Sequence, residues 1–290
     1  MLEALRAQTL PASRWELLLV DNASREPLEP AWDLSWHPQA RHVREDQPGL
    51  VHARARGIRE SRGDIMIFVD DDNVLAEDYL ATGEEILRHG SHLGAIGAGH
   101  IVGEFEVPPP KDMEVHLIAL ALKELEYDHW TNFGGYTYGL PLGAGMCFRR
   151  KVGDDYLRKL ESDPLRQMLG RAGSDRLISG EDTDLALCAH DLGMGTGRFI
   201  ALRILHLIPR ERFAGDYLVR LYVGFTQAGE ILHFIRHRTL APQSSTPVRL
   251  MRNIYRACTY RGLNRRIFIA QEKARDEIRR MLANRITAES

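Results

Sequence analysis

The sequence is poor in the residues that build disulfide-stapled or membrane-spanning folds. Its 290 residues include three cysteines, Cys147, Cys188 and Cys258, which lie far apart without CxxC spacing. This pattern argues against a disulfide framework and a zinc knuckle, and it favours a cytoplasmic location. The longest notable run without charge, residues 130–148, holds five glycines and a proline, so it does not predict a transmembrane helix. The first ten residues lack the apolar core of a signal peptide.

The chain also has little net charge, −2 at pH 7, but the charge is unevenly distributed. Residues 1–216 carry 24 Lys and Arg against 35 Asp and Glu, whereas residues 217–290 carry 14 against 5. The hydrophobic content of 44% is typical of a globular chain with one large domain or two ordinary ones. We therefore expect the acidic and basic parts to face different partners.

Uninterrupted apolar runs alternate with helical patterns in the first two thirds of the chain. Acidic residues directly follow each of the runs 15–20 and 65–69. Between the two runs, residues 52–61 have helical spacing. Such a pattern predicts an α/β fold with a mostly parallel sheet and helices on both faces. We also expect strands at 93–102 and 199–205, and helices at 76–89, 113–125 and 180–192. Beyond Asp216 the pattern is helical, with a linker at 241–247.

Carboxylates follow the two apolar runs. Asp21 ends the first run, and Asp70, Asp71 and Asp72 end the second. Ligands of open α/β sheets bind beyond the carboxyl ends of strands. Three consecutive carboxylates repel one another, and a hard divalent cation is the simplest compensation. The alternative is a polar turn that caps the next helix.

A second acidic cluster, residues 179–184, opens a predicted helix. Acids in a first turn also suit the helix dipole, so this cluster alone does not decide between capping and catalysis. His206 follows a predicted strand, and a lone histidine is an ordinary surface or core residue as readily as a ligand.

Six segments, in this order and at these separations, resemble the nucleotide-sugar glycosyltransferases of family 2, which have the GT-A fold. The resemblance covers about residues 1–215 and implies a GT-A domain there, followed by a helical, basic extension over 216–290. The segments are 20–24, 53–57, 68–73, 143–149, 180–185 and 206–209.

The resemblance implies roles in donor binding. Asp21 matches the acid that receives the nucleotide base. Asp72 and His206 match ligands of Mn²⁺ or Mg²⁺ on the donor diphosphate, and Asp70, with Asp71 beside it, matches the acid that touches the ribose or the metal. The metal would neutralise the leaving nucleoside diphosphate.

Other residues match the reacting end of the family site. Asp182 corresponds to the general base of the family's ED motif, with Glu181 beside it. A single base on the far face of the sugar predicts inversion. Arg54 is expected to face the nucleotide, and Gly145 to let the backbone pass close to the donor sugar.

The chain departs from the family pattern in two places. It starts after the strand with which the family begins, so we expect that first strand to be lacking. The family's Ala-Arg-Asn stretch reads Ala53-Arg54-Ala55 here, without the asparagine.

These features predict a metal-dependent, inverting glycosyltransferase that moves a sugar, with a UDP-sugar as the expected donor, to a glycan or lipid-linked acceptor. One alternative is a haloacid-dehalogenase-like phosphohydrolase, since 68–72 also fits a strand followed by DxD. That fold needs a later lysine, and the chain has only five. Another is a catalytically impaired nucleotide-sugar-binding module. Trp130, Asn132 and Tyr136 are candidate acceptor contacts or, alternatively, packing residues.

The basic C-terminal segment allows three interpretations. Residues 249–290 hold 11 basic against 4 acidic residues, interleaved with apolar side chains. They form a solvated face, dock on an anionic membrane where lipid-linked acceptors reside, or bind nucleic acid. No nucleic-acid fold signature supports the last, so we expect no nucleic-acid partner. The second would place the protein peripherally on the inner face of the cytoplasmic membrane.

Overall fold

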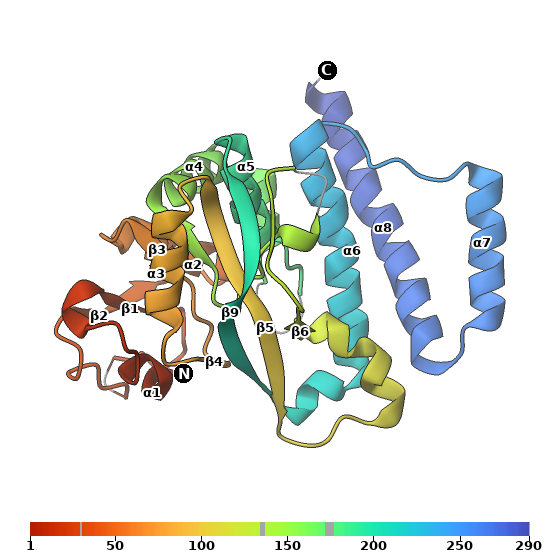
Figure 1. Cartoon of the computed structure of the whole chain (residues 1–290). Helices are drawn as coiled ribbons and strands as arrows, with labels where there is room; N and C mark the ends of the chain where they lie inside the picture. The colour runs from red at the N-terminus through yellow and green to blue at the C-terminus, as the bar shows by residue number, and fades with distance from the viewer. Residues whose placement is uncertain (30, 134–136, 172–176, 290) are drawn as a thin grey trace. The chain divides into compact units, whose positions relative to one another are not determined.

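The computed structural model describes residues 1–29, 31–133, 137–171 and 177–289 (Figure 1). The chain divides into two compact units, Met1–Asp163 with Glu181–Arg210, and Pro164–Gly180 with Glu211–Ser290. The sequence did not separate 164–180 from its neighbours, and the boundary after residue 215 stays a prediction. Among the described residues, no helix is both long and apolar enough to cross a bilayer.

The first unit is a mixed α/β structure. In chain order its helices and strands are α1 (Leu2–Arg6), β1 (Leu17–Asn22), β2 (Ala40–Glu45), α2 (Leu50–Glu60), β3 (Ile65–Ile67), β4 (Asn73–Leu75), α3 (Tyr79–His89), β5 (Leu93–Phe105), β6 (Lys123–Glu124), β7 (His129–Thr131), β8 (Cys147–Arg149), α4 (Arg150–Ser162), α5 (Glu181–Asp191) and β9 (Gly195–Ile208). Short 3₁₀ segments lie at Ala12–Arg14, Lys111–Leu120 and Thr137–Gly139. The α/β fold class is confirmed.

The main sheet is mixed, whereas the sequence predicted a mostly parallel one. Within the described residues its order is β3-β8-β5-β9-β4, with β6 on β5 and β7 on β9. Only β5 and β9 run parallel there, and β1 and β2 form a separate parallel pair. A strand buried on both faces is apolar throughout whichever way it runs, so its composition does not report its direction.

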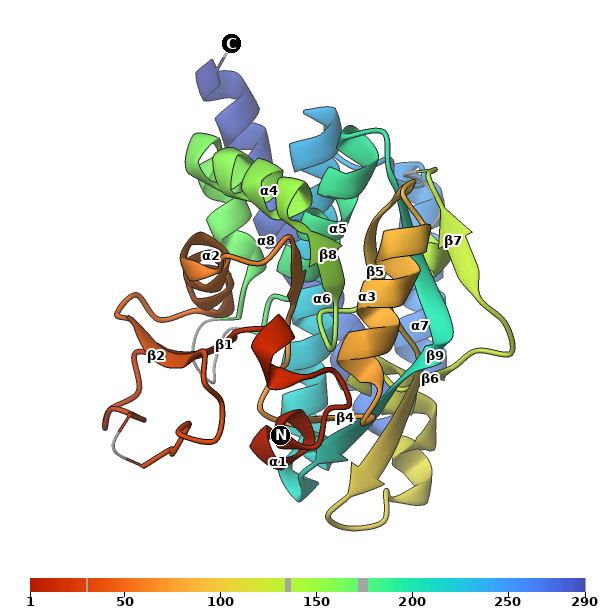
Figure 2. The same cartoon turned by 60° about the vertical axis from the view of Figure 1, so that its left-hand side comes forward.

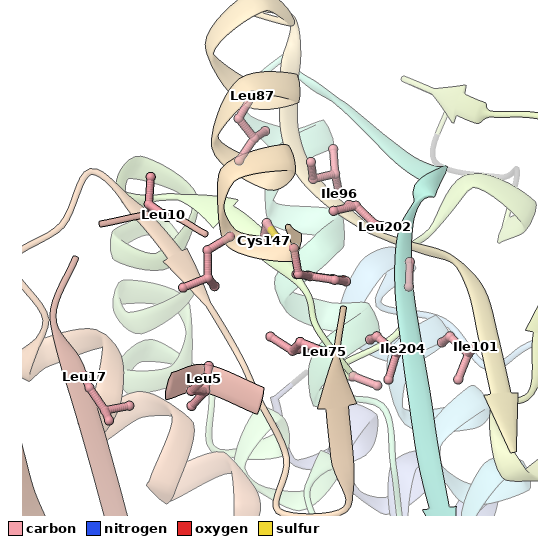
Figure 3. Packing of buried hydrophobic residues seen from close by; sticks show 14 of the residues in the cluster. Leu5, Leu10, Leu17, Leu75, Leu87, Ile96, Ile101, Cys147, Leu202 and Ile204 are labelled. Atoms are coloured by element: carbon pink, nitrogen blue, oxygen red, sulfur yellow. The ribbon is translucent and has the colours of Figure 1, made fainter. Parts of the chain in front are cut away.

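Helices cover both faces of the sheet, as alternate residues of β3 and β8 show. Ile65, Ile67 and Cys147 pack with the cluster that contains α3 (Figure 3). Met66 and Phe148 point the other way, into a cluster with α2, α4 and α5. Figure 2 shows α3 on one side of β8 and α2 and α4 on the other. The predicted helices on both faces are therefore present.

The predicted amphipathic helix at 113–125 is wrong. Residues Lys111–Leu120 form a 3₁₀ segment, and Lys123 and Glu124 pair with β5 as β6. Ala121 adopts a left-handed backbone with φ +64°, which stops the helical path. Two apolar residues of the segment, Val115 and Ile118, are 69% and 71% exposed, so the segment has no continuous buried stripe.

Strand β2 was not predicted because its sequence, Ala-Arg-His-Val-Arg-Glu, is almost entirely polar and buries only Val43. Strand β4 was not predicted either, because its residues directly follow the acidic cluster. It pairs with β9 in antiparallel register, with Asn73 opposite His206. This register brings Asp72, the last residue of the acidic cluster 70–72, next to His206 near the end of β9.

The second unit is helical. It contains a 3₁₀ segment at Pro164–Leu169 and the helices α6 (Gly215–His237), α7 (Thr246–Thr259) and α8 (Gly262–Glu289), with the short 3₁₀ turn Arg210–Phe213 at its start. Its core joins α6 and α8 to the 164–180 segment through Leu169, Ile178, Ile231, Phe234 and Leu282. The predicted helical C-terminal part is confirmed.

We expect Leu87→Ala to destabilise the first unit. Leu87 is fully buried on α3 among the side chains of Figure 3, so truncation leaves a cavity and should cost about 2–5 kcal/mol. Leu192→Ala, at a residue 39% exposed, is the matched control and should change the free energy of unfolding by less than about 1 kcal/mol. Urea unfolding measures both, and equal losses would contradict the assigned core.

Candidate active site

Asp72 is held by residues on β4 and β9. Its Oδ1 accepts a hydrogen bond from Asn73 Nδ2 at 2.9 Å, and its Oδ2 lies 3.3 Å from His206 Nε2. The backbone N–H of Leu207 donates to the carbonyl of Asp72 at 2.8 Å. The structure thus brings together the two residues predicted as metal ligands, although they are 134 positions apart in the sequence.

A divalent cation fits this pair of side chains. A carboxylate oxygen and an imidazole nitrogen are both ligands that Mn²⁺ accepts, whereas Mg²⁺ favours oxygen alone. The 3.3 Å between Asp72 Oδ2 and His206 Nε2 resembles the spacing of neighbouring ligands that each lie about 2.1 Å from one ion. His206 is 13% exposed at its side chain, so only a small part of it is open to solvent.

Arg54 joins the two acidic motifs. From α2, its Nη1 donates to Glu181 Oε1 at 2.8 Å and its Nη2 to Asp70 Oδ1 at 3.3 Å. Its guanidinium also lies 5.0 Å from the centre of the Phe68 ring. Arg54 and Glu181 are 7% and 2% exposed, so this ion pair is buried. One cation therefore fixes Asp70 and the start of α5 next to each other.

The charge of Arg54 is secured by this surrounding. Burial alone lowers the pKa of Arg54, but the carboxylates of Asp70 and Glu181 raise it above its ordinary value, with a further contribution from Asp182. A Cβ at Gly143 would lie 2.5 Å from Arg54 Nη2, so a larger residue there would displace the guanidinium from this position. This contact was not predicted from the sequence, although the glycine-rich segment around Gly143 was a signal for it.

Asp182 is oriented by backbone donors. Gly143 N–H donates to its Oδ2 at 2.8 Å, and Thr183 N–H to its Oδ1 at 2.7 Å. Unlike its buried neighbour Glu181, Asp182 is partly exposed. Asp182 is thus a fixed carboxylate with access to solvent.

Gly145 has a packing reason to be glycine. Its φ is +68°, and a Cβ there would lie 2.3 Å from the Tyr79 hydroxyl. That buried hydroxyl donates to the Gly145 carbonyl at 2.8 Å. The predicted approach of this backbone to a donor sugar stays a prediction.

Two further residues were predicted for the site. Asp71 is exposed, and Tyr136 lies outside the described residues.

Asp21 accepts hydrogen bonds from the loop that follows it and from β2. Its described hydrogen bonds come from Ser24 N–H, Leu28 N–H and Arg44 Nη1, at 3.1, 3.2 and 2.6 Å. Burial alone raises the pKa of Asp21, but hydrogen bonds from Ser24, Arg44 and Leu28 outweigh it and lower this pKa to about 2. Its proposed contact with a nucleotide base stays a prediction.

A further group of metal-ligand types lies between α4 and α5. It consists of a carboxylate oxygen of Asp155, the Sγ of Cys188 and a carboxylate oxygen of Asp191. These three atoms lie within 4.8 Å of one another. Lys159 Nζ lies 2.6 Å from Asp155 Oδ2 and 2.5 Å from Asp191 Oδ2. Because this ammonium already supplies the compensating charge, we interpret the group as an ion-paired contact between two helices.

We expect Asp21→Asn to destabilise the protein by about 1 kcal/mol at pH 7, after allowing for screening by solvent. The folded pKa of about 2 lies below the ordinary 3.8, so the contribution is present above about pH 4 and is lost as the pH falls through about 2. Urea unfolding at several pH values measures it. A gap between the two proteins that stays constant down to pH 2 would contradict this assignment.

We expect Arg54→Met to cost about 3–5 kcal/mol, because it leaves the Glu181 carboxylate buried without its partner. Adding Glu181→Gln should recover at least about 1 kcal/mol in a double-mutant cycle. Arg59→Met, which breaks an exposed ion pair with Glu161, is the control and should cost less than about 1 kcal/mol. Additive effects of the two site substitutions in urea unfolding would refute the coupling.

The comparisons with known proteins agree with the fold. Residues 1–146, half of the chain, match the family described as Glycosyl transferase family 2. No match was found among curated proteins. A structure of GalNAc-T7 with UDP, GalNAc and Mn²⁺ is 14% identical, with a TM-score of 0.51, over 88% of this chain and 51% of that one. A structure of S. aureus TarS 1–349 is 12% identical, with a TM-score of 0.44, over 97% and 86%.

The GalNAc-T7 structure has the GT-A fold, so the fold expected from the sequence motifs is confirmed. The chain spans about half the length of that structure. Since the family match covers half of the chain and includes β1 to β7, this protein belongs to glycosyl transferase family 2.

Proposed function

We propose that the protein is a metal-dependent, inverting glycosyltransferase of the hexosyltransferase type that uses a nucleotide-diphosphate sugar. The observation that carries this proposal is the contact of Arg54 with both Asp70 and Glu181. It places the DxD segment beside the acidic start of α5, as a donor site next to a general base requires. The match to the family over residues 1–146 supports the same activity.

In this proposal Asp72 and His206 hold Mn²⁺ or Mg²⁺, and Asp70 faces the donor near them. The ion would offset the charge that develops on the nucleoside diphosphate as the glycosidic bond breaks. Asn73 donates to Asp72 Oδ1 and thereby leaves Oδ2 turned toward His206. Arg54 limits the movement of Asp70, which is 34% exposed at its side chain.

Asp182 is the better candidate for the base. Glu181 is 2% exposed and paired with Arg54, so its carboxylate is committed to holding α5 in place. Asp182 is partly exposed, and Gly143 and Thr183 fix its orientation through backbone N–H groups. A carboxylate held in this way can take the proton of an acceptor hydroxyl as it attacks, which leads to inversion in a single displacement.

We propose a UDP-sugar as donor and a glycan or a lipid-linked saccharide as acceptor. The GalNAc-T7 structure with the same fold contains UDP, a sugar and Mn²⁺, the ligand set proposed here. Nucleotide contacts of Asp21, Asp71 and Gly145 belong to this proposal. So does a cytoplasmic location with peripheral contact to an anionic membrane, which the basic excess of residues 217–290 supports.

The phosphohydrolase alternative loses its support. The family match accounts for the DxD segment on which it rested. In addition, Asp70, the nucleophile of that alternative, is ion-paired with Arg54. Activity measurements decide whether the protein is instead a catalytically impaired nucleotide-sugar-binding module.

We expect Mn²⁺-dependent release of UDP from at least one member of a panel of UDP-sugars, with candidate glycan acceptors present. Asp72→Asn should lower the rate about 100-fold or more, because it weakens the hold on the metal. Asp182→Asn should lower kcat by about 100-fold or more while KM for the donor changes little. Asp154→Asn, an exposed carboxylate on α4, is the matched control and should retain full activity.

Each alternative has its own outcome in this assay. Activity that survives chelation of divalent cations would refute the metal requirement. Donor binding with Mn²⁺ but no turnover in the presence of any acceptor would establish the impaired module instead. Equal losses in Asp154→Asn and Asp182→Asn would contradict the role of Asp182.

A further inference from the structure

Helix α7 presents its apolar side chains to solvent and its polar ones to the protein, the reverse of an ordinary surface helix. One arc of the helix points away from α8, and its members are 55–71% exposed. This arc, called here the outer face of α7, comprises Val248, Leu250, Met251, Ile254 and Tyr255. Figure 1 shows α7 beside α8 within the second unit.

The opposite arc of α7 is polar and is already used. Arg249 forms an ion pair with Asp276 of α8, and Asn253 Nδ2 donates to Glu272 Oε2 at 2.8 Å. The guanidinium of Arg256 lies 5.8 Å from the centre of the Phe268 ring. These contacts fix which side of α7 faces α8, so the exposure of the apolar arc follows from the structure of this unit.

The segments that flank the outer face carry an excess of positive charge, while the acidic residues Glu272 and Asp276 of α8 face the polar arc of α7. Residues 231–271 contain eight arginines and no aspartate or glutamate. Two of them, Arg261 and Arg265, follow α7 directly and are exposed, whereas Arg266 is ion-paired with Asp216. An apolar stripe bordered by cations matches the boundary between anionic headgroups and acyl chains.

We propose that the outer face of α7 is a docking surface for an anionic lipid bilayer, on which α7 lies in the plane of the interface. The apolar side chains enter the headgroup boundary, and the flanking arginines bind lipid phosphates. This inference rests on the membrane contact proposed above and identifies α7 as the helix that makes this contact. It is independent of sugar transfer, since docking requires neither donor nor metal.

Cys258 supplies a probe at the right place. It is exposed at the end of α7, whereas Cys147 and Cys188 are buried, so a thiol-reactive fluorophore will label position 258 selectively. We expect the emission of an environment-sensitive dye there to shift to the blue with vesicles of phosphatidylcholine and phosphatidylglycerol at a 7:3 ratio. With pure phosphatidylcholine, or at 0.5 M NaCl, the shift should largely vanish.

Sedimentation of the unlabelled full chain with the same vesicles tests the apolar and the electrostatic contributions to binding separately. Met251→Ser with Ile254→Ser should lower the partition coefficient at least about tenfold through lost apolar contact. Arg261→Gln with Arg265→Gln should lower the partition coefficient about 25-fold, at about fivefold for each arginine. The control, Val115→Ser with Ile118→Ser, removes comparably exposed apolar residues from the first unit. It should leave the partition coefficient unchanged.

Three results would overturn the proposal. The first is a wild-type chain that does not sediment with the anionic vesicles, and the second is equal sedimentation of all variants. The third is a particle mass by light scattering that falls from dimer to monomer in Met251→Ser with Ile254→Ser, which would assign the outer face to a second copy of the chain. Circular dichroism of each variant verifies that it folds, and intact UDP release in a non-sedimenting variant would separate docking from catalysis.

Discussion

The candidate active site depends on one buried guanidinium. Arg54 comes from α2, yet the groups that it binds lie on the segment after β3 and at the start of α5. A buried carboxylate such as Glu181 is costly unless a cation compensates it, and so is a buried cation without a carboxylate. The three segments therefore reach low free energy together only in an arrangement that brings the start of α5 close to Asp70.

The register between β4 and β9 provides the second constraint. Because Asn73 pairs with His206, the residue before Asn73 lies beside the imidazole ring. A shift by one residue would turn the alternate side chains of β4 to the other face of the sheet and separate Asp72 from His206. Backbone pairing thus positions the predicted metal ligands, and a cation would add to an arrangement that the sheet already determines.

Much of this could be predicted from the sequence, for identifiable reasons. The runs at 15–20 and 65–69 were recognised because burial on both faces requires continuous apolar residues, and the acidic residues after them marked the ends of the strands. Strand direction and the strands β2 and β4 could not be predicted, because β2 is polar and β4 is a three-residue strand that depends on pairing with β9. Residues that match a motif could be named as site candidates from the sequence, but the contact between Arg54 and Glu181 depends on tertiary structure.

The close approach of Gly143 to Arg54 links the evolution of these two positions. A side chain at 143 would lie 2.5 Å from Arg54 Nη2, so it could be accepted only if the guanidinium moved or residue 54 became smaller. A smaller residue at 54 would in turn leave Glu181 without its cation, which demands a neutral residue at 181. Positions 54, 143 and 181 are therefore coupled through one guanidinium, and a change at any of them alters the surroundings of the other two.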